Sequence, residues 1–210
     1  MKFWKYAAAG AAVLSIGAAG AYAQYRNSVD EPDYSLVAEE GDIQLREYAP
    51  MIVAEVTHTG DRRRALNAGF RRLAAYIFAQ DRPGKEIAMT SPVMQDQGEK
   101  IAMTSPVMQD GGETSGSWRT RFVMPAEYTM ETLPTPPDDV TLVEMPPRKV
   151  AAIRFSGRGS SDDLAAREEE LRAWIADRDL MIAGPAEFAF YDAPMVPPPL
   201  RRNEVIIPVE

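Results

Sequence analysis

The sequence predicts an α+β fold in which about eight mainly antiparallel strands form a sheet with two helices on its outside. A degenerate repeat brings back the same order of strand, Pro turn, strand and Gly after 97 residues. Each copy leads into a segment with the apolar period of a helix, and strand-like segments follow each helix. A helix with one apolar stripe needs a surface to cover, so both helices are expected to lie on the sheet.

The repeat places residues 46–60 on residues 143–157 without a gap. Six aligned pairs agree in chemistry: Glu47/Glu144, Pro50/Pro147, Val53/Val150, Ala54/Ala151, Val56/Ile153 and Gly60/Gly157. The shared order of elements makes duplication a better explanation than coincidence. We therefore predict two related halves, at about 34–133 and 138–210, joined by the proline-rich connector 133–139.

Each half contains one segment whose apolar residues recur at helical spacing. In the first half these are Leu66, Phe70, Leu73 and Ile77. In the second half they are Leu164, Leu171, Trp174 and Ile175, with Ser160 or Ser161 as the N-cap. The strands expected after the helices are Ile87 to Met94, Trp118 to Met124, Ala186 to Tyr191 and Glu204 to Val209.

A second repeat is short and perfect. Residues 87–96 recur unchanged as residues 101–110, and Gly84 and Gly98 extend the unit to a 14-residue tandem. Two units are too few for a solenoid. We expect one copy to belong to the core sheet and the surplus, at about 95–116, to form a mobile surface excursion.

The N-terminus has the features of an export signal. Lys2 and Lys5 precede an uncharged run rich in Ala and Gly, and Ala21-Tyr22-Ala23 is a small-x-small cleavage site. Residues 1–23 are expected to be a cleaved signal peptide, with uncleaved attachment to the inner membrane through residues 6–23 as the alternative. Residues 24–33 would then be a linker, and the protein would lie in the periplasm or cell envelope.

Composition excludes several functional classes. The formal charge of −8 gives no electrostatic footprint for nucleic acid. The absence of cysteine excludes disulfides, thiolate nucleophiles, iron–sulfur clusters and covalent haem attachment. His58 is the single histidine, which excludes a site with several imidazoles.

Two kinds of residue could bind a metal. The repeated methionines Met89, Met94, Met103 and Met108 could hold a soft cation, although core packing or pocket lining explains them better. His58 could ligate a haem iron as a lone axial ligand, but a surface or edge-strand position explains it better.

Several stretches together resemble the SOUL haem-binding family. They are Tyr34–Val37, Ile43–Tyr48 with Pro50, Ala65–Leu73 with Tyr76 and Ile77, Lys100–Val107, Tyr191–Pro194 and Arg201–Val205. The resemblance runs from about Tyr34 to Val209. It implies a distorted eight-stranded antiparallel β-barrel, built from two βαββ halves and flanked by two α-helices, which agrees with the duplication.

The resemblance also implies an apolar groove for haem or another porphyrin, bound non-covalently between the first helix and the loop before the last strand. Carried onto this chain, the groove would use Asn67, Phe70, Leu73 and Ala74 from the helix, and Tyr191 and Met195 from the loop. Some members carry a basic residue on this helix face, where this chain has Asn67 and Ala75. Propionate pairing is therefore expected from Arg71, Arg201 or Arg202.

Some members have a histidine proposed as axial ligand where this chain has Glu47, and His58 does not occupy that position. We therefore expect binding by burial of the macrocycle, with metal ligation optional. The predicted function is an exported tetrapyrrole carrier, buffer or scavenger. The alternatives are a general small-molecule effector-binding module, a haem-modifying enzyme, for which the sequence offers no clear acid/base constellation, and a purely structural envelope protein. The oligomeric state is left open.

Overall fold

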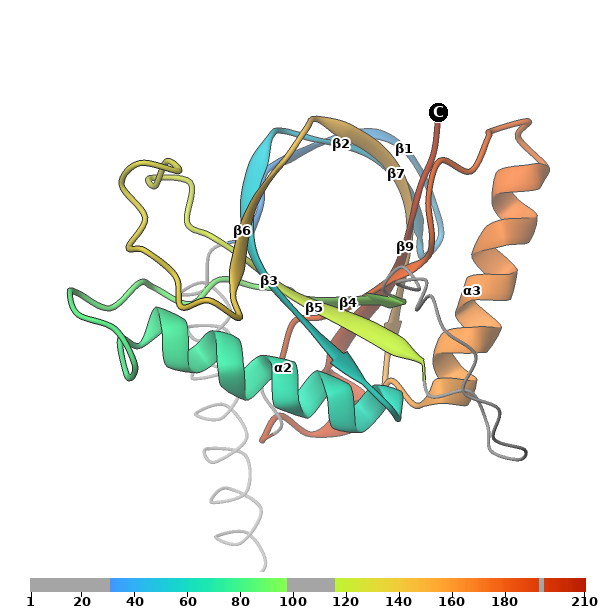
Figure 1. Cartoon of the computed structure of the whole chain (residues 1–210). Coiled ribbons are helices and arrows are strands. Elements are labelled where there is room, and N and C mark those ends of the chain that lie inside the picture. Colours follow the sequence, from blue (N-terminus) through green and yellow to red (C-terminus); the bar gives the residue numbers. More distant parts are fainter. Residues whose placement is uncertain (1–30, 98–115, 193–194) are drawn as a thin grey trace, which may run out of the picture. The chain divides into compact units, whose positions relative to one another are not determined.

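Nine strands of the described residues join in one antiparallel sheet, which curls into a ring (Figure 1). The structure is a computed structural model that describes residues 31–97, 116–192 and 195–210. The strands are β1 (Tyr34–Glu40), β2 (Ile43–Tyr48), β3 (Met51–Thr59), β4 (Val93–Gln97), β5 (Ser117–Val123), β6 (Thr141–Met145), β7 (Arg148–Ser156), β8 (Glu187–Phe190) and β9 (Arg202–Pro208). The helices are α2 (Arg62–Ile77), α3 (Ser161–Ala176) and the short 3-10 helix η1 (Pro198–Leu200).

The predicted α+β barrel-like fold is confirmed, and β1 adds an edge strand to the eight that were expected. The strand order is β1-β2-β7-β9-β8-β4-β5-β3-β6. From β2 inward the order is β2-β7-β9-β8, and from the opposite edge it is β6-β3-β5-β4. The two sides of the sheet therefore have equivalent strand orders and meet where β4 pairs with β8. Strands β2 and β6 each lie beside strands of the other half of the chain. Descent of the halves from one duplicated unit remains a prediction.

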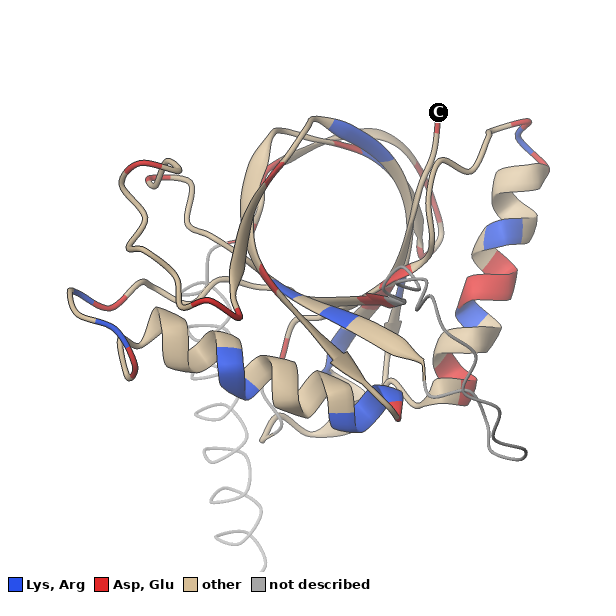
Figure 2. Ribbon diagram, in the orientation of Figure 1, with Lys and Arg blue, Asp and Glu red and all other residues tan. Residues whose placement is uncertain are grey.

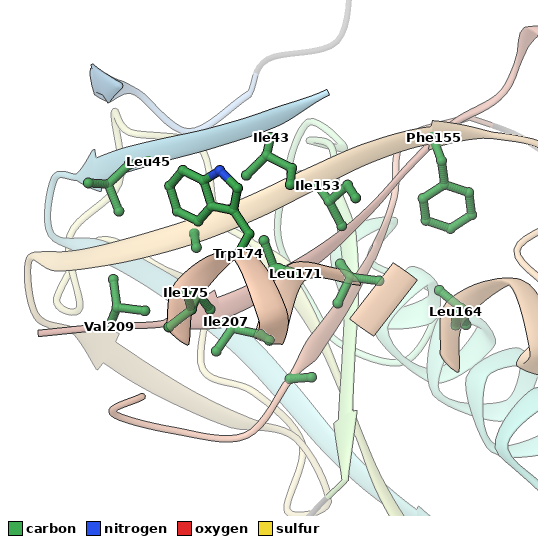
Figure 3. Close-up of a cluster of buried hydrophobic side chains, with 13 residues drawn as sticks. Ile43, Leu45, Ile153, Phe155, Leu164, Leu171, Trp174, Ile175, Ile207 and Val209 are labelled. Carbon is green, nitrogen blue, oxygen red and sulfur yellow. The ribbon is translucent and has the colours of Figure 1, made fainter. Parts of the chain in front are cut away.

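Helix α3 covers β7 and β9 with the predicted stripe. Figure 3 shows the side chains of this helix packed against those of the strands below. All four predicted residues of the stripe are buried: Leu164, Leu171, Trp174 and Ile175. Ser160 is the N-cap. Its hydroxyl accepts a hydrogen bond from the Asp163 N–H, and the Asp163 carboxylate accepts one from the Ser160 N–H, which completes a capping box.

Helix α2 packs on β3 and β5 with a face that differs slightly from the predicted one. Leu73 and Ile77 are buried as predicted, but Leu66 and Phe70 are only partly buried. Ala65, Gly69 and Tyr76 complete the buried face. The shift arises because small residues let the helix approach the sheet closely, so the bulkier Leu66 and Phe70 are displaced to one flank.

Side chains alternate between the two faces of each strand, so the sheet has an outer face under the helices and an inner face. On β7, for example, Ala151 and Ile153 pack with α3, whereas Val150 and Ala152 belong to a separate cluster with Tyr191. The inner face is thus distinct from the face that the helices cover.

The first copy of the short repeat supplies β4, although the strand begins at Val93 rather than at Ile87. Pro92 cannot donate to a strand ladder, and the Ser91 hydroxyl bonds the carbonyl of Tyr191 instead. The second copy and residues 1–30 lie outside the described residues. Within the described part of the chain, no helix is long and apolar enough to cross a membrane.

Replacing Gly69 by Ala is expected to destabilise the protein by about 1–3 kcal/mol. In an exposed helix this change would stabilise by about 1 kcal/mol. Here a Cβ would lie 2.5 Å from the Thr120 Oγ1 and 2.6 Å from its Cβ. Urea unfolding beside the exposed Asn67→Ala variant measures the effect, and a raised midpoint for Gly69→Ala would contradict this packing.

Candidate functional site

A fully buried ion pair lies on the inner face of the sheet. The Arg46 NH1 and NH2 groups donate to the two carboxylate oxygens of Glu204 at 2.7 and 3.0 Å. Both side chains are 0% exposed. Arg46 comes from β2 and Glu204 from β9, so the pair joins strands that flank β7.

Three further side chains bind the Glu204 carboxylate. The Tyr191 hydroxyl donates to it at 2.7 Å, the Arg202 Nε at 3.0 Å and the Arg154 Nε at 3.4 Å. The Arg202 guanidinium also lies 3.8 Å from the centre of the Tyr191 ring. Burial alone would raise the pKa of Glu204, but the hydrogen bonds and charges of Arg46 and Arg202 lower it to about 2. Glu204 is therefore an ionised, paired acid.

A second ionic cluster lies on the same face, around Asp96 of β4. Arg119 NH2 and Arg121 NH1 donate to one Asp96 oxygen at 2.6 and 3.2 Å. Arg121 also bonds Glu55 at 2.9 Å. Arg148 binds Glu187 through two bonds of 2.6 and 2.8 Å. These acids are neutralised by arginines, so they offer no unpaired charge to a cationic ligand.

The partly exposed apolar surface of α2 lies on the other side of the sheet. Leu66 and Phe70 are half-buried, and the Phe70 ring packs edge-on against Phe122 at 5.4 Å. Ala74 is also half-buried on this flank. Leu73 is 0% exposed, so it belongs to the core beneath the helix.

The segment 87–92 connects this flank of α2 with the loop before β9. The Ile87 N–H donates to the Ile77 carbonyl at 2.8 Å, next to the end of the helix. At the other end of the segment the Ser91 hydroxyl donates to the Tyr191 carbonyl at 3.2 Å. Met89, between them, is half-buried in the same cluster as Phe70. Segment 87–92 thus bridges the two elements that the groove was expected to use.

The predicted site residues fall into two groups. Tyr191 and Arg202 lie at the inner-face ion pair. The other predicted site residues lie on α2 or on the proline-rich loop between β8 and β9. Asn67 and Arg71 are exposed on the helix, and Met195 is 87% exposed on the loop. The Arg201 Nε donates to the Val196 carbonyl at 2.7 Å. The structure therefore does not place the side chains of Tyr191 and Phe70 on one surface.

His58 lies on β3, and its Nδ1 is buried without a hydrogen-bond partner in the described residues. In the β3–β5 ladder His58 is opposite Trp118. The pKa of Asp139 is lowered mainly by hydrogen bonds from Arg72 of α2, and the charge of His58 contributes. Because Arg72 and Phe70 are two residues apart, they point to opposite flanks of α2. The described residues contain no group of three or more His, Asp or Glu side chains that could hold a metal.

A depression of about 440 Å³ lies where the β2–β3 and β6–β7 turns meet. It is lined by Ser35, Glu47, Tyr48, Ala49, Pro147, Arg148 and Lys149. Its lining is partly polar and partly apolar, and none of its residues belongs to α2 or to the loop before β9.

Sequence reasoning missed the inner-face ionic clusters. Arg46 and Glu204 are 158 residues apart, so no spacing links them. The local sequence gives no alternation that marks the pair either, because Arg202, Asn203 and Glu204 are consecutive polar residues and the predicted strand began only at Glu204.

The family model described as SOUL heme-binding protein matches residues 29–208. This chain belongs to the SOUL heme-binding protein family. The match spans all nine strands and both long helices, so the resemblance found in the sequence is confirmed. No curated protein matches this SOUL-family chain.

Solved structures share the fold of this SOUL-family protein at low identity. An uncharacterized conserved protein from Listeria innocua is 12% identical with a TM-score of 0.56, covering 82% of this chain and 94% of that chain. The C-terminal domain of EcmrR is 13% identical with a TM-score of 0.54, covering 84% and 98%. EcmrR in a complex with DNA is 13% identical with a TM-score of 0.58, covering 100% and 69%. At these identities the likeness concerns the fold alone.

Proposed function

We propose that this SOUL-family protein is an exported tetrapyrrole-binding protein that acts as a carrier, buffer or scavenger. Family membership supports a haem or porphyrin ligand. The observation that carries the proposal for this chain is the half-buried apolar strip of Leu66, Phe70 and Met89, which segment 87–92 connects with the proline-rich loop before β9. A flat macrocycle could cover this strip, which is already partly shielded from water.

The strip has the chemistry that a porphyrin requires. Removing apolar surface from water stabilises a complex by about 25 cal/mol per Å². Met195 is the most exposed large apolar side chain on the neighbouring loop, and it could close over the ring. Basic positions lie along α2 (Figure 2), and Arg71 at the rim of the strip could pair with a propionate.

The residues of the strip do not favour ligation of iron by histidine. His58, the single histidine of the chain, is opposite Trp118 in the β3–β5 ladder, four residues along β5 from the Phe122 on which Phe70 packs. Among its described residues the strip offers only the weak thioether ligand of Met89, and Met195 on the loop before β9 could add a second. Burial of the macrocycle would therefore supply most of the binding free energy.

Metal-free protoporphyrin IX and haemin are accordingly expected to bind with dissociation constants within about tenfold of each other, since apolar burial is common to both. Absorbance and fluorescence titration of residues 24–210 measures both constants. A strong preference for haemin that is lost in His58→Ala would contradict this model. Incubation with haemin and a reductant separates binding, seen as a stable Soret shift, from catalysis, seen as loss of absorbance with product formation.

Export and envelope localisation remain part of the proposal and depend on residues 1–23. Fractionation of cells that express the full chain tests both. Release of a shortened chain with the periplasmic contents would support cleavage after Ala23. A full-length chain that stays with the membrane fraction would support attachment through residues 6–23.

The effector-binding alternative gains no support from the buried acids. A cation site requires an acid that faces the ligand without a partner, and Glu204 is fully paired with Arg46 and Arg202. Glu47 is exposed at the depression beside the β2–β3 turn, so it is not a buried acid.

A further inference from the structure

Strand β4 belongs to a sequence that the chain carries twice. Residues 87–96 contain most of β4, and residues 101–110 are identical to them. Every side chain that anchors the first copy therefore has a counterpart 14 residues later in the sequence.

The contacts that hold β4 are specific and deeply buried. Met94, Gln95 and Asp96 are 1–3% exposed. The Asp96 carboxylate accepts hydrogen bonds from Arg119 and Arg121, and the Gln95 amide donates to the Arg62 carbonyl at 3.0 Å. A segment of unrelated sequence could not replace these interactions.

The partners of these residues all lie outside the repeat, so they do not distinguish the copies. Arg119 and Arg121 belong to β5, and Arg62 belongs to α2. On the other side β4 pairs with β8. If the second copy took the place of the first, Met108, Gln109 and Asp110 would meet the partners that Met94, Gln95 and Asp96 now contact.

The connecting segments permit either arrangement. Asp96 is opposite Arg119 in the β4–β5 ladder. With Asp110 in that place, about eight residues would still separate it from Arg119, which is enough for a hairpin loop. The link from α2 would lengthen by 14 residues, and the entropy of loop closure changes only logarithmically with length. The two arrangements should therefore have populations within about tenfold of each other.

We propose that the two copies compete for the β4 position, so that the folded protein interconverts between two strand registers 14 residues apart. The registers share the same buried ion pairs and differ in which copy is left outside the sheet. This inference rests on the repeat and on the contacts of β4, and it is independent of tetrapyrrole binding.

Asparagine replacements of the two aspartates test the proposal in the full chain. Asp96→Asn and Asp110→Asn should each lower the folding equilibrium constant by less than about tenfold, because the intact copy takes the strand position. The double variant should lower it by at least about 100-fold, since Arg119 and Arg121 then lose the buried carboxylate in both registers. Urea unfolding of the four proteins measures the difference.

A full loss in either single variant, equal to that of the double variant, would show that one copy alone forms β4 and would overturn the proposal. Methyl NMR provides a readout that does not depend on the ion-pair energy. Met94→Leu and Met108→Leu assign the two methionine signals in the otherwise unchanged chain. We expect a buried and an exposed population for each methionine, whereas a single buried signal for one and a single exposed signal for the other would overturn the exchange.

Discussion

Replacing Glu204 by Gln is expected to lower the free energy of unfolding by about 3–5 kcal/mol, the largest change in stability predicted for this protein. Gln keeps the shape of the side chain but removes the charge that compensates Arg46. Both side chains are 0% exposed, so the Arg46 guanidinium would be left as an uncompensated buried cation. Urea unfolding at pH 7 of wild type and variant measures the loss.

The pH dependence of this effect follows from the pKa of Glu204, which is lowered from 4.5 to about 2 in the folded protein. A lowered carboxyl pKa stabilises the folded state above the unfolded value and ceases to do so as pH falls through the folded value. The shift corresponds to about 3 kcal/mol at neutral pH. The stability difference between wild type and Glu204→Gln should therefore be constant above about pH 5 and shrink between pH 4.5 and 2.

The matched control is Glu168→Gln on α3. Glu168 forms an i,i+4 ion pair with Arg172 at 2.8 Å on the helix surface. Its loss should cost less than about 0.5 kcal/mol. Two results would show that the buried pair of Arg46 and Glu204 does not stabilise the fold in this way. One is a loss of unfolding free energy in Glu204→Gln as small as that in the control, and the other is a loss that stays unchanged down to pH 2.

Replacing Phe70 by Ala is expected to weaken porphyrin binding by about 10- to 100-fold, the largest change in affinity predicted here. Phe70 is half-buried on α2, so its exposed edge could contact a macrocycle while its inner edge packs on Phe122. Burial of such a ring contributes about 1.5–3 kcal/mol. Titration with protoporphyrin IX measures the change without a contribution from iron.

Three control variants separate this contact from a general loss of structure. Phe70→Leu retains an apolar side chain and should keep most of the affinity. Met195→Ala, at a side chain that is 87% exposed, should weaken binding with little effect on the urea midpoint. Met181→Ala removes another exposed methionine, beyond the end of α3, and should change neither the affinity nor the urea midpoint. Equal affinities across all these variants would remove the strip from the site.

The parts of the fold that depend on local chemistry could be predicted from the sequence. The stripe of α3 and its Ser160 cap are set by residues within one helix, and both are confirmed. The face of α2 was predicted less well, because the stripe was identified from large apolar residues. Gly69 is buried because the helix lies close to Thr120, and a pattern of hydrophobicity does not detect close approach.

The inner-face ion pairs depend on tertiary structure and could not be predicted residue by residue. Arg46 meets Glu204 only because β2 and β9 flank β7 in the sheet. The same arrangement explains why Tyr191 and Phe70, although both were assigned to the groove, lie on opposite faces. Successive residues of a strand point to opposite faces of the sheet, so a shift of one residue changes the face. The Tyr191 side chain, at the start of the loop before β9, lies on the inner face, whereas the helices cover the outer face.

The most direct test of the proposed site is methyl NMR of the protein with and without protoporphyrin IX, whose ring current shifts nearby methyl signals. Binding at the strip should give large shifts for Leu66, Ala74 and Met89 beside α2, and none for Ile153 and Ile207 beneath α3. Large shifts confined to Val150, Ala152 and Ile206 on the inner face, with the α2 methyls unchanged, would contradict it.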